Sequence, residues 1–170
     1  MRKELEEFQW HVYGLSKDDL SYVVRVTQEI IDDRKTVLEK EIEKIKQENP
    51  EDADDILDDY VYYKNLECFY LWEFLIIRLI GVFEGVMEQN FLPQGKYRGY
   101  QHRLETLVKN GYKIENIDEL GKWVNLRNAL SHMPPEQHRP ILIDKDDIAD
   151  LEKLLIAEIE NLESQKASKT

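Results

Sequence analysis

Apolar residues recur along this chain with the spacing of α-helices. From Leu20 to Ile45 they fall mostly three or four positions apart, and the positions between them are largely charged. This pattern is typical of a helix with one face against protein and the other in water. From Trp72 to Met87 the chain is apolar nearly all round. That stretch is therefore expected in the middle of a helical bundle.

Capping and helix-breaking residues divide the chain into its elements. The first long helix begins near Ser16, and Asn49-Pro50 ends it and starts a second, over about 50–90. Shorter helices are predicted over about 100–110, closed by Gly111, then about 117–132 and 144–162. We expect an all-α fold, a bundle of about five helices, two long and three short. One domain covers residues 1–163, and 164–170 form a flexible C-terminal tail.

The composition indicates a globular protein and argues against one kind of nucleic-acid binding. The 170 residues are 42% hydrophobic and 34% charged, which suits one globular domain with a real core. The net charge of −12 disfavours a protein that coats nucleic acid without specificity, because phosphates are repelled.

The basic residues are unevenly distributed. Residues 91–140 hold eight basic side chains against five acidic ones, together with three of the four histidines. Contact with an anion is expected in this stretch, unless its mildly basic character has arisen by chance.

Cys68 is the only cysteine, which excludes an intrachain disulfide and a cysteine-based metal cluster. One thiol and a charged N-terminus without a signal-peptide pattern favour the cytoplasm. The most apolar stretch is interrupted by Arg78 and Glu84, so no membrane span is expected. No sequence pattern calls for a cofactor or a metal.

One group of polar residues is a candidate catalytic site. Arg127 is followed directly by Asn128, and His132 comes five positions after the arginine, at the predicted end of a helix. Arg127 and Ser131 are four apart, as are Asn128 and His132, so the polar side chains lie on adjacent stripes.

These residue types suit metal-independent cleavage of RNA. The 2′-hydroxyl of RNA attacks the neighbouring phosphate when one group removes its proton and another protonates the leaving oxygen. Histidine transfers protons near neutral pH, and arginine binds phosphate oxygens through paired donors. One helix supplies one Arg127 and one His132, so two copies related by a two-fold axis would supply two of each.

The Arg-Asn-x-x-x-His core, Arg127 to His132 late in an all-helical domain, resembles the HEPN superfamily. The resemblance implies a helical bundle, a homodimer with the two motifs facing each other, and a metal-independent endoribonuclease. Many such proteins act in toxin–antitoxin, antiviral-defence or RNA-processing systems. Arg127 and His132 match the catalytic pair, Asn128 matches the polar residue after the arginine, and Ser131 is a further supporting residue. An antitoxin or regulatory protein is a candidate partner beside the RNA substrate.

The sequence departs from that family at one place. Toxins of the family paired with nucleotidyltransferase antitoxins typically carry a tyrosine two residues after the histidine, where this chain has Pro134. Regulation through a tyrosine at that position is therefore not expected. The alternative is a non-catalytic helical module that dimerises or holds a partner on its acidic N-terminal helices. Arg127 would then pair with a surface carboxylate, and His132 would only cap a helix end.

A second basic stretch lies before the motif. Residues 96–103 interleave basic and aromatic side chains, so Arg98, His102 and Arg103 are candidates for binding substrate phosphate. The other interpretation of its tyrosines is that they anchor the core.

Two charged features are interpreted as structural. Arg78, inside the apolar helix, is expected to be buried and paired, either in a structural ion pair, with Glu73, Glu84 and Glu88 near its stripe, or in one across a dimer interface. The alternative is a supporting role behind the Arg127–His132 site. The acidic run over residues 51–59 lacks the glycine and closing glutamate of an EF-hand loop and suits a solvated first helical turn.

Overall fold

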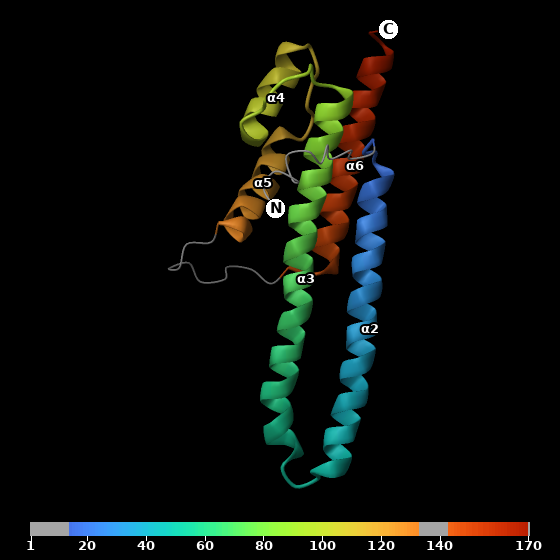
Figure 1. Cartoon of the computed structure of the whole chain (residues 1–170), viewed down its shortest axis with the longest axis vertical. Coiled ribbons are helices and arrows are strands. Elements are labelled where there is room, and N and C mark those ends of the chain that lie inside the picture. Colours follow the sequence, from blue (N-terminus) through green and yellow to red (C-terminus); the bar gives the residue numbers. More distant parts are fainter. Residues whose placement is uncertain (1–13, 133–142, 170) are drawn as a thin grey trace, which may run out of the picture.

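The chain folds as a bundle of helices, seen in a computed structural model that describes residues 14–132 and 143–169 (Figure 1). Its helices are α2 (Asp18–Glu48), α3 (Ala53–Asn90), α4 (Gly99–Lys109), α5 (Ile117–Ser131) and α6 (Lys145–Ala167), with no strand in these two ranges. The predicted all-α bundle of two long and three shorter helices is confirmed. None of the helices in these ranges is long and apolar enough to cross a membrane.

Helix α3 is the centre of the bundle, as its apolar sequence predicts. It runs antiparallel to α2, α6 lies along the upper part of both, and α4 and α5 lie on the other side of α3 (Figure 1). Because α3 contacts each of the other four helices, most apolar side chains of its second half are buried. Its fully buried side chains include Ile76, Leu79, Ile80, Phe83 and Met87.

The lower half of the α2–α3 hairpin, residues 32–70, projects beyond the other helices as an arm (Figure 1). Apolar residues of α2 within the arm are less covered than their helical spacing suggests. Val37 is 53% exposed, and only Leu20 and Ile31 of α2 are buried. Packing against a single partner helix covers one narrow stripe, which explains the difference.

The C-terminal end differs from the predicted tail. Helix α6 continues to Ala167, so residues 164–167 are helical and the boundary at residue 163 is corrected. Tertiary contacts stabilise this extension. The Lys166 ammonium donates to the Asn90 carbonyl at 2.7 Å, and the Gln165 amide donates to the Lys113 carbonyl at 2.8 Å.

Arg78 also differs from expectation, because it is exposed. Glu84 and Glu88, two of its three predicted partners, pair with Arg103 and Arg127 instead. At 100° per residue, Glu84 lies about 240° around the helix from Arg78. The acid and the arginine therefore face different neighbours.

Candidate functional site

Helix α5 places the motif residues at its C-terminal end. The helix ends at Ser131, and His132 occupies the C-cap, where its backbone N–H donates to the Asn128 carbonyl at 3.0 Å. The Ser131 hydroxyl donates to the Arg127 carbonyl at 2.9 Å. His132 is exposed, so its imidazole is accessible to a ligand.

The Arg127 side chain turns inward to α3. Its Nη2 donates to Glu84 Oε1 at 2.6 Å, and the arginine and glutamate side chains are 23% and 14% exposed. Arg127 Nε is buried and has no acceptor among the residues described. One edge of the guanidinium is therefore anchored by a carboxylate in a site with little water, where an ion pair is screened weakly.

Arg103 joins the same carboxylate from α4. Its Nη1 lies 3.8 Å from Glu84 Oε2, and its Nε donates to Glu88 Oε1 at 2.6 Å. Its Nη2 also pairs with Glu88. Glu84 thus links α3 to both α4 and α5, and two guanidinium groups share its charge.

A buried tyrosine, Tyr100, lies close to the Glu84 carboxylate. The Tyr100 hydroxyl is enclosed, with no hydrogen-bond partner in the described ranges. Burial, and then the nearby charges of Glu158 and Glu84, raise the pKa of Tyr100. Glu158 is fully buried and accepts from the Asn161 amide at 2.9 Å and the Glu115 backbone N–H at 3.3 Å.

Tyr100→Phe is expected to stabilise the protein by about 1 kcal/mol, because it removes a buried hydroxyl without a partner. The pKa of Tyr100 is raised in the folded state above its unfolded value. Above about pH 10 the unfolded chain loses this proton more readily than the folded protein does, so the free energy of unfolding falls as the pH rises further. Urea unfolding between neutral and alkaline pH should show a shallower alkaline loss for Tyr100→Phe than for wild type. Tyr62→Phe, at an exposed position, is the control. Identical alkaline profiles for wild type and Tyr100→Phe would contradict this prediction.

A groove of about 560 Å³ separates α4 from α5. Arg98, Tyr100 and Gln101 line it from the start of α4, and Lys122 and Asn128 are among its lining residues on α5. Since Asn128 follows Arg127 directly, this groove borders the motif. The structure therefore brings Arg98 and Asn128, both predicted site residues, to one concave surface.

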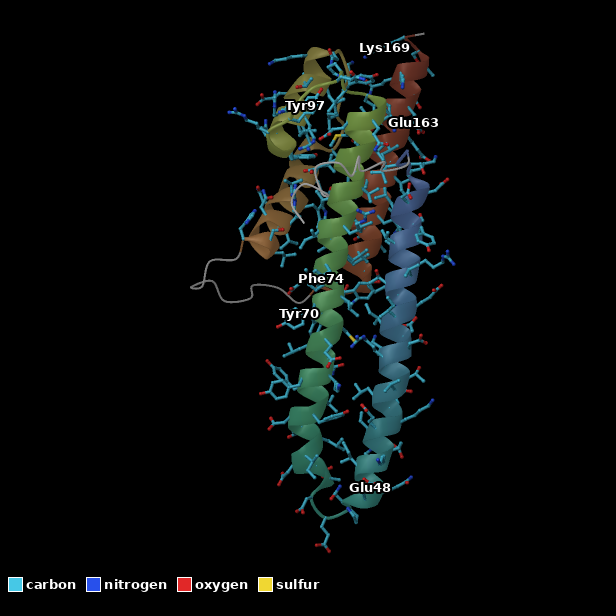
Figure 2. The ribbon with its side chains drawn as sticks, viewed as in Figure 1. Glu48, Tyr70, Phe74, Tyr97, Glu163 and Lys169 are labelled. Atoms are coloured by element: carbon cyan, nitrogen blue, oxygen red, sulfur yellow. The ribbon has the colours of Figure 1, made fainter. Side chains whose placement is uncertain are left out.

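The remaining predicted residues take other places. His102 Nδ1 accepts the Arg98 backbone N–H at 3.1 Å, and its ring centroid lies 5.6 Å from that of Tyr97, which Figure 2 labels beside α4. Arg103 is engaged by two carboxylates rather than open to substrate. Tyr100 is buried in the core, which confirms for this residue the interpretation that the tyrosines of this stretch are core anchors. Sequence reasoning missed the burial of Glu158. Glu84, an acid among apolar residues of the central helix, was the available signal for a buried ion pair.

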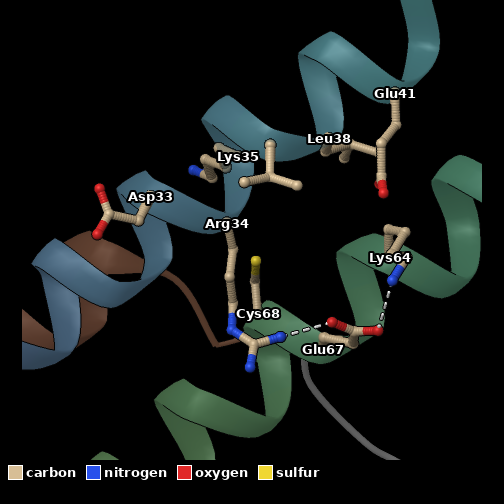
Figure 3. Close-up of a pocket in the computed structure, with 9 residues that line it drawn as sticks. Asp33, Arg34, Lys35, Leu38, Glu41, Lys64, Glu67 and Cys68 are labelled. Atoms are coloured by element: carbon tan, nitrogen blue, oxygen red, sulfur yellow. Dashed lines mark hydrogen bonds and ion pairs between the residues drawn. The ribbon is translucent and has the colours of Figure 1, made fainter. Parts of the chain in front are cut away.

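A second pocket, of about 210 Å³, lies between α2 and α3 at the arm (Figure 3). Charged side chains that line this pocket pair with one another: Glu67 accepts from Arg34 at 2.6 Å and from Lys64 at 3.2 Å. Buried Cys68 lies beside them. Across residues 14–132 and 143–169, no group of three or more His, Cys, Asp or Glu side chains is arranged to hold a metal ion.

Comparisons with models of known protein families, with curated proteins and with solved structures found no match to this chain.

Proposed function

We propose that this chain is a metal-independent endoribonuclease of the HEPN type, acting as a homodimer in toxin–antitoxin or antiviral defence. Arg127 and His132 of two copies form its composite site. The proposal rests on one observation: the C-terminal end of α5 holds both an arginine fixed by a carboxylate and an exposed histidine that can transfer a proton. Glu84 holds the Arg127 guanidinium, and His132 is exposed at the C-cap.

The chemistry assigned to these residues follows from their positions. One His132 removes the proton of the 2′-hydroxyl, whose oxygen forms a bond to the adjacent phosphorus. The bond from phosphorus to the 5′ oxygen breaks, and the second His132 gives that oxygen a proton. Arg127 stabilises the negative charge on the phosphoryl oxygens in the transition state. No proton is consumed overall, and the products are a 2′,3′-cyclic phosphate and a 5′-hydroxyl.

This proposal predicts the product ends. Purified protein incubated with total RNA and EDTA is expected to produce fragments with 2′,3′-cyclic phosphate and 5′-hydroxyl ends. A short RNA with 2′-O-methyl groups at its cleavage positions should resist, because the attacking hydroxyl is blocked. Ligation assays specific for each kind of end provide the measurement.

His132→Ala protein purified in the same way controls for contaminating ribonucleases. Fragments with 5′-phosphate ends, or equal cutting by the His132→Ala protein, would reject the assignment. Sedimentation equilibrium of the wild-type protein tests the homodimer independently of activity.

A second candidate function, a partner-binding helical module, is favoured by the arm. Tyr62 and Tyr63 are exposed there, and residues 48–59 carry seven acidic and no basic side chains. Phe74, labelled in Figure 2 midway along α3, is exposed as well. Exposed aromatic side chains are typical of protein-binding surfaces. In this case a basic partner would bind the arm, and Tyr62→Ser/Tyr63→Ser would abolish that binding while His132→Ala would change nothing.

A further inference from the structure

We propose that the groove between α4 and α5 is a subsite for one splayed-out nucleotide of single-stranded RNA, next to the Arg127–His132 site. This inference rests on the proposed function, and it names the part of the substrate that the site recognises.

The size and walls of the groove suit a nucleotide. Its volume of about 560 Å³ falls within the range typical of small-ligand sites, about 300–1,000 Å³. Leu104 and Val124 supply an apolar floor, since both are buried and both line it. A flat base can rest on such a floor while polar groups on either wall contact its edge.

The charged residues of the groove favour a phosphate. Arg98 and Lys122 line it, against the single carboxylate of Asp118, in a chain whose net charge is −12. Within the described part of the chain, neither Arg98 nor Lys122 makes a side-chain ion pair, although four cations of the arm do. Two cations without a protein partner on one concave surface are available to bind the RNA backbone.

Three side-chain amides of the groove provide hydrogen-bond donors and acceptors that can recognise the edge of a base. Gln101 lies on the α4 side, and Asn125 and Asn128 lie on α5. Gln101 donates to Glu105 at 3.3 Å, which leaves its carbonyl oxygen as an acceptor. Asn125 and Asn128 are exposed, so their side-chain amides are accessible to a ligand. Amides offer a donor and an acceptor together, the arrangement that pairs with a base edge.

The position of the groove fixes which nucleotide it holds. It extends along α5 from Ile117 to Asn128, which lies one helical turn before His132. A phosphate held at the Arg127–His132 site would therefore have a neighbouring base close to this groove. A base paired within a duplex cannot enter, so single-stranded RNA is the ligand.

Binding of a short fluorescent single-stranded RNA tests the subsite. The measurement uses full-length His132→Ala protein as the parent, so that RNA is not cut, and records anisotropy over a series of salt concentrations. Arg98→Gln and Lys122→Gln are each expected to reduce the slope of log affinity against log salt by about 0.7. Lys109→Gln, on the last turn of α4 outside the groove, is the matched control and should leave the slope unchanged. Asn125→Ala should reduce the affinity difference between homopolymers by about fivefold.

The outcomes separate this subsite from the proposed function. If all three groove variants bind as the parent does while wild type still releases cyclic-phosphate ends, the subsite is rejected and the nuclease stands. If wild type does not cut and the parent binds no single-stranded RNA, both are rejected. Duplex RNA bound as tightly as single-stranded RNA would overturn the splayed-out nucleotide. Circular dichroism confirms that each variant is folded.

Discussion

Replacing His132 with alanine is expected to reduce the rate of RNA cleavage by at least about 100-fold, the usual contribution of a general acid or base. The free energy of unfolding should change by less than about 0.5 kcal/mol, as for most exposed positions. The side chain is exposed, and its contribution to the helix end is a backbone hydrogen bond to Asn128, which alanine retains. Single-turnover cleavage and urea unfolding measure the two quantities.

Position 132 gives a cleaner test than position 127. Arg127→Ala would leave Glu84 with only the longer contact to Arg103, at 3.8 Å, and would lower stability together with activity. Arg25→Ala, at an exposed position on α2, controls for loss of an arginine at the surface. A His132→Ala protein that is stable and fully active would reject the assignment of His132 as the catalytic residue.

Mixing tests whether the site is shared. When equal amounts of wild type and His132→Ala are allowed to exchange subunits, half of the wild-type chains pair with an altered copy. If each reaction needs a base and an acid from two copies, the activity of the wild-type chains should fall to about half. Unchanged activity would show that each copy works alone.

The helix boundaries were largely predictable from the sequence because helix ends are specified locally. Gly111, with a φ of +76°, closes α4 as predicted, since glycine adopts the left-handed conformation without strain. The end of α6 was predicted too early. Its last turn is stabilised by contacts such as Lys166 with the Asn90 carbonyl, 76 residues away in sequence, and no local pattern contains that information.

The candidate site was predictable only in part. Arg127 and Asn128 lie in α5 and His132 is its C-cap, so their spacing alone places them near one another. The partner of Arg127 lies on α3, 43 residues away, and the nearby Arg78 offered a plausible but incorrect pairing for Glu84. The burial of Glu158 results from the packing of helices distant in sequence, which periodicity does not specify.

Replacing Glu84 with alanine is expected to lower the free energy of unfolding by about 3 kcal/mol, the magnitude for removing one member of a buried ion pair. The Glu84 side chain is only 14% exposed and faces both Arg127 and Arg103. Its removal leaves Arg127 without its acceptor in a site with little water. Urea denaturation followed by circular dichroism measures the change.

Glu88 provides the matched control, since it lies four residues along α3 and also pairs with Arg103. Its side chain is 38% exposed, so Glu88→Ala should cost less than about 1 kcal/mol. Equal losses for the two variants would show that position along α3, rather than burial of the charge, determines the cost.

The double variant Glu84→Leu/Arg127→Met tests whether the cost of Glu84→Ala comes from the lost charge pairing or from the lost packing volume. If the cost of Glu84→Ala comes from leaving Arg127 uncompensated, replacing both charges with apolar side chains should recover most of the lost stability. The coupling between the two positions is then about 1–3 kcal/mol. The same double variant should still fail to cut RNA, because it lacks the cation at Arg127. Stability recovered without activity would show that the fold can dispense with this ion pair and that RNA cleavage cannot.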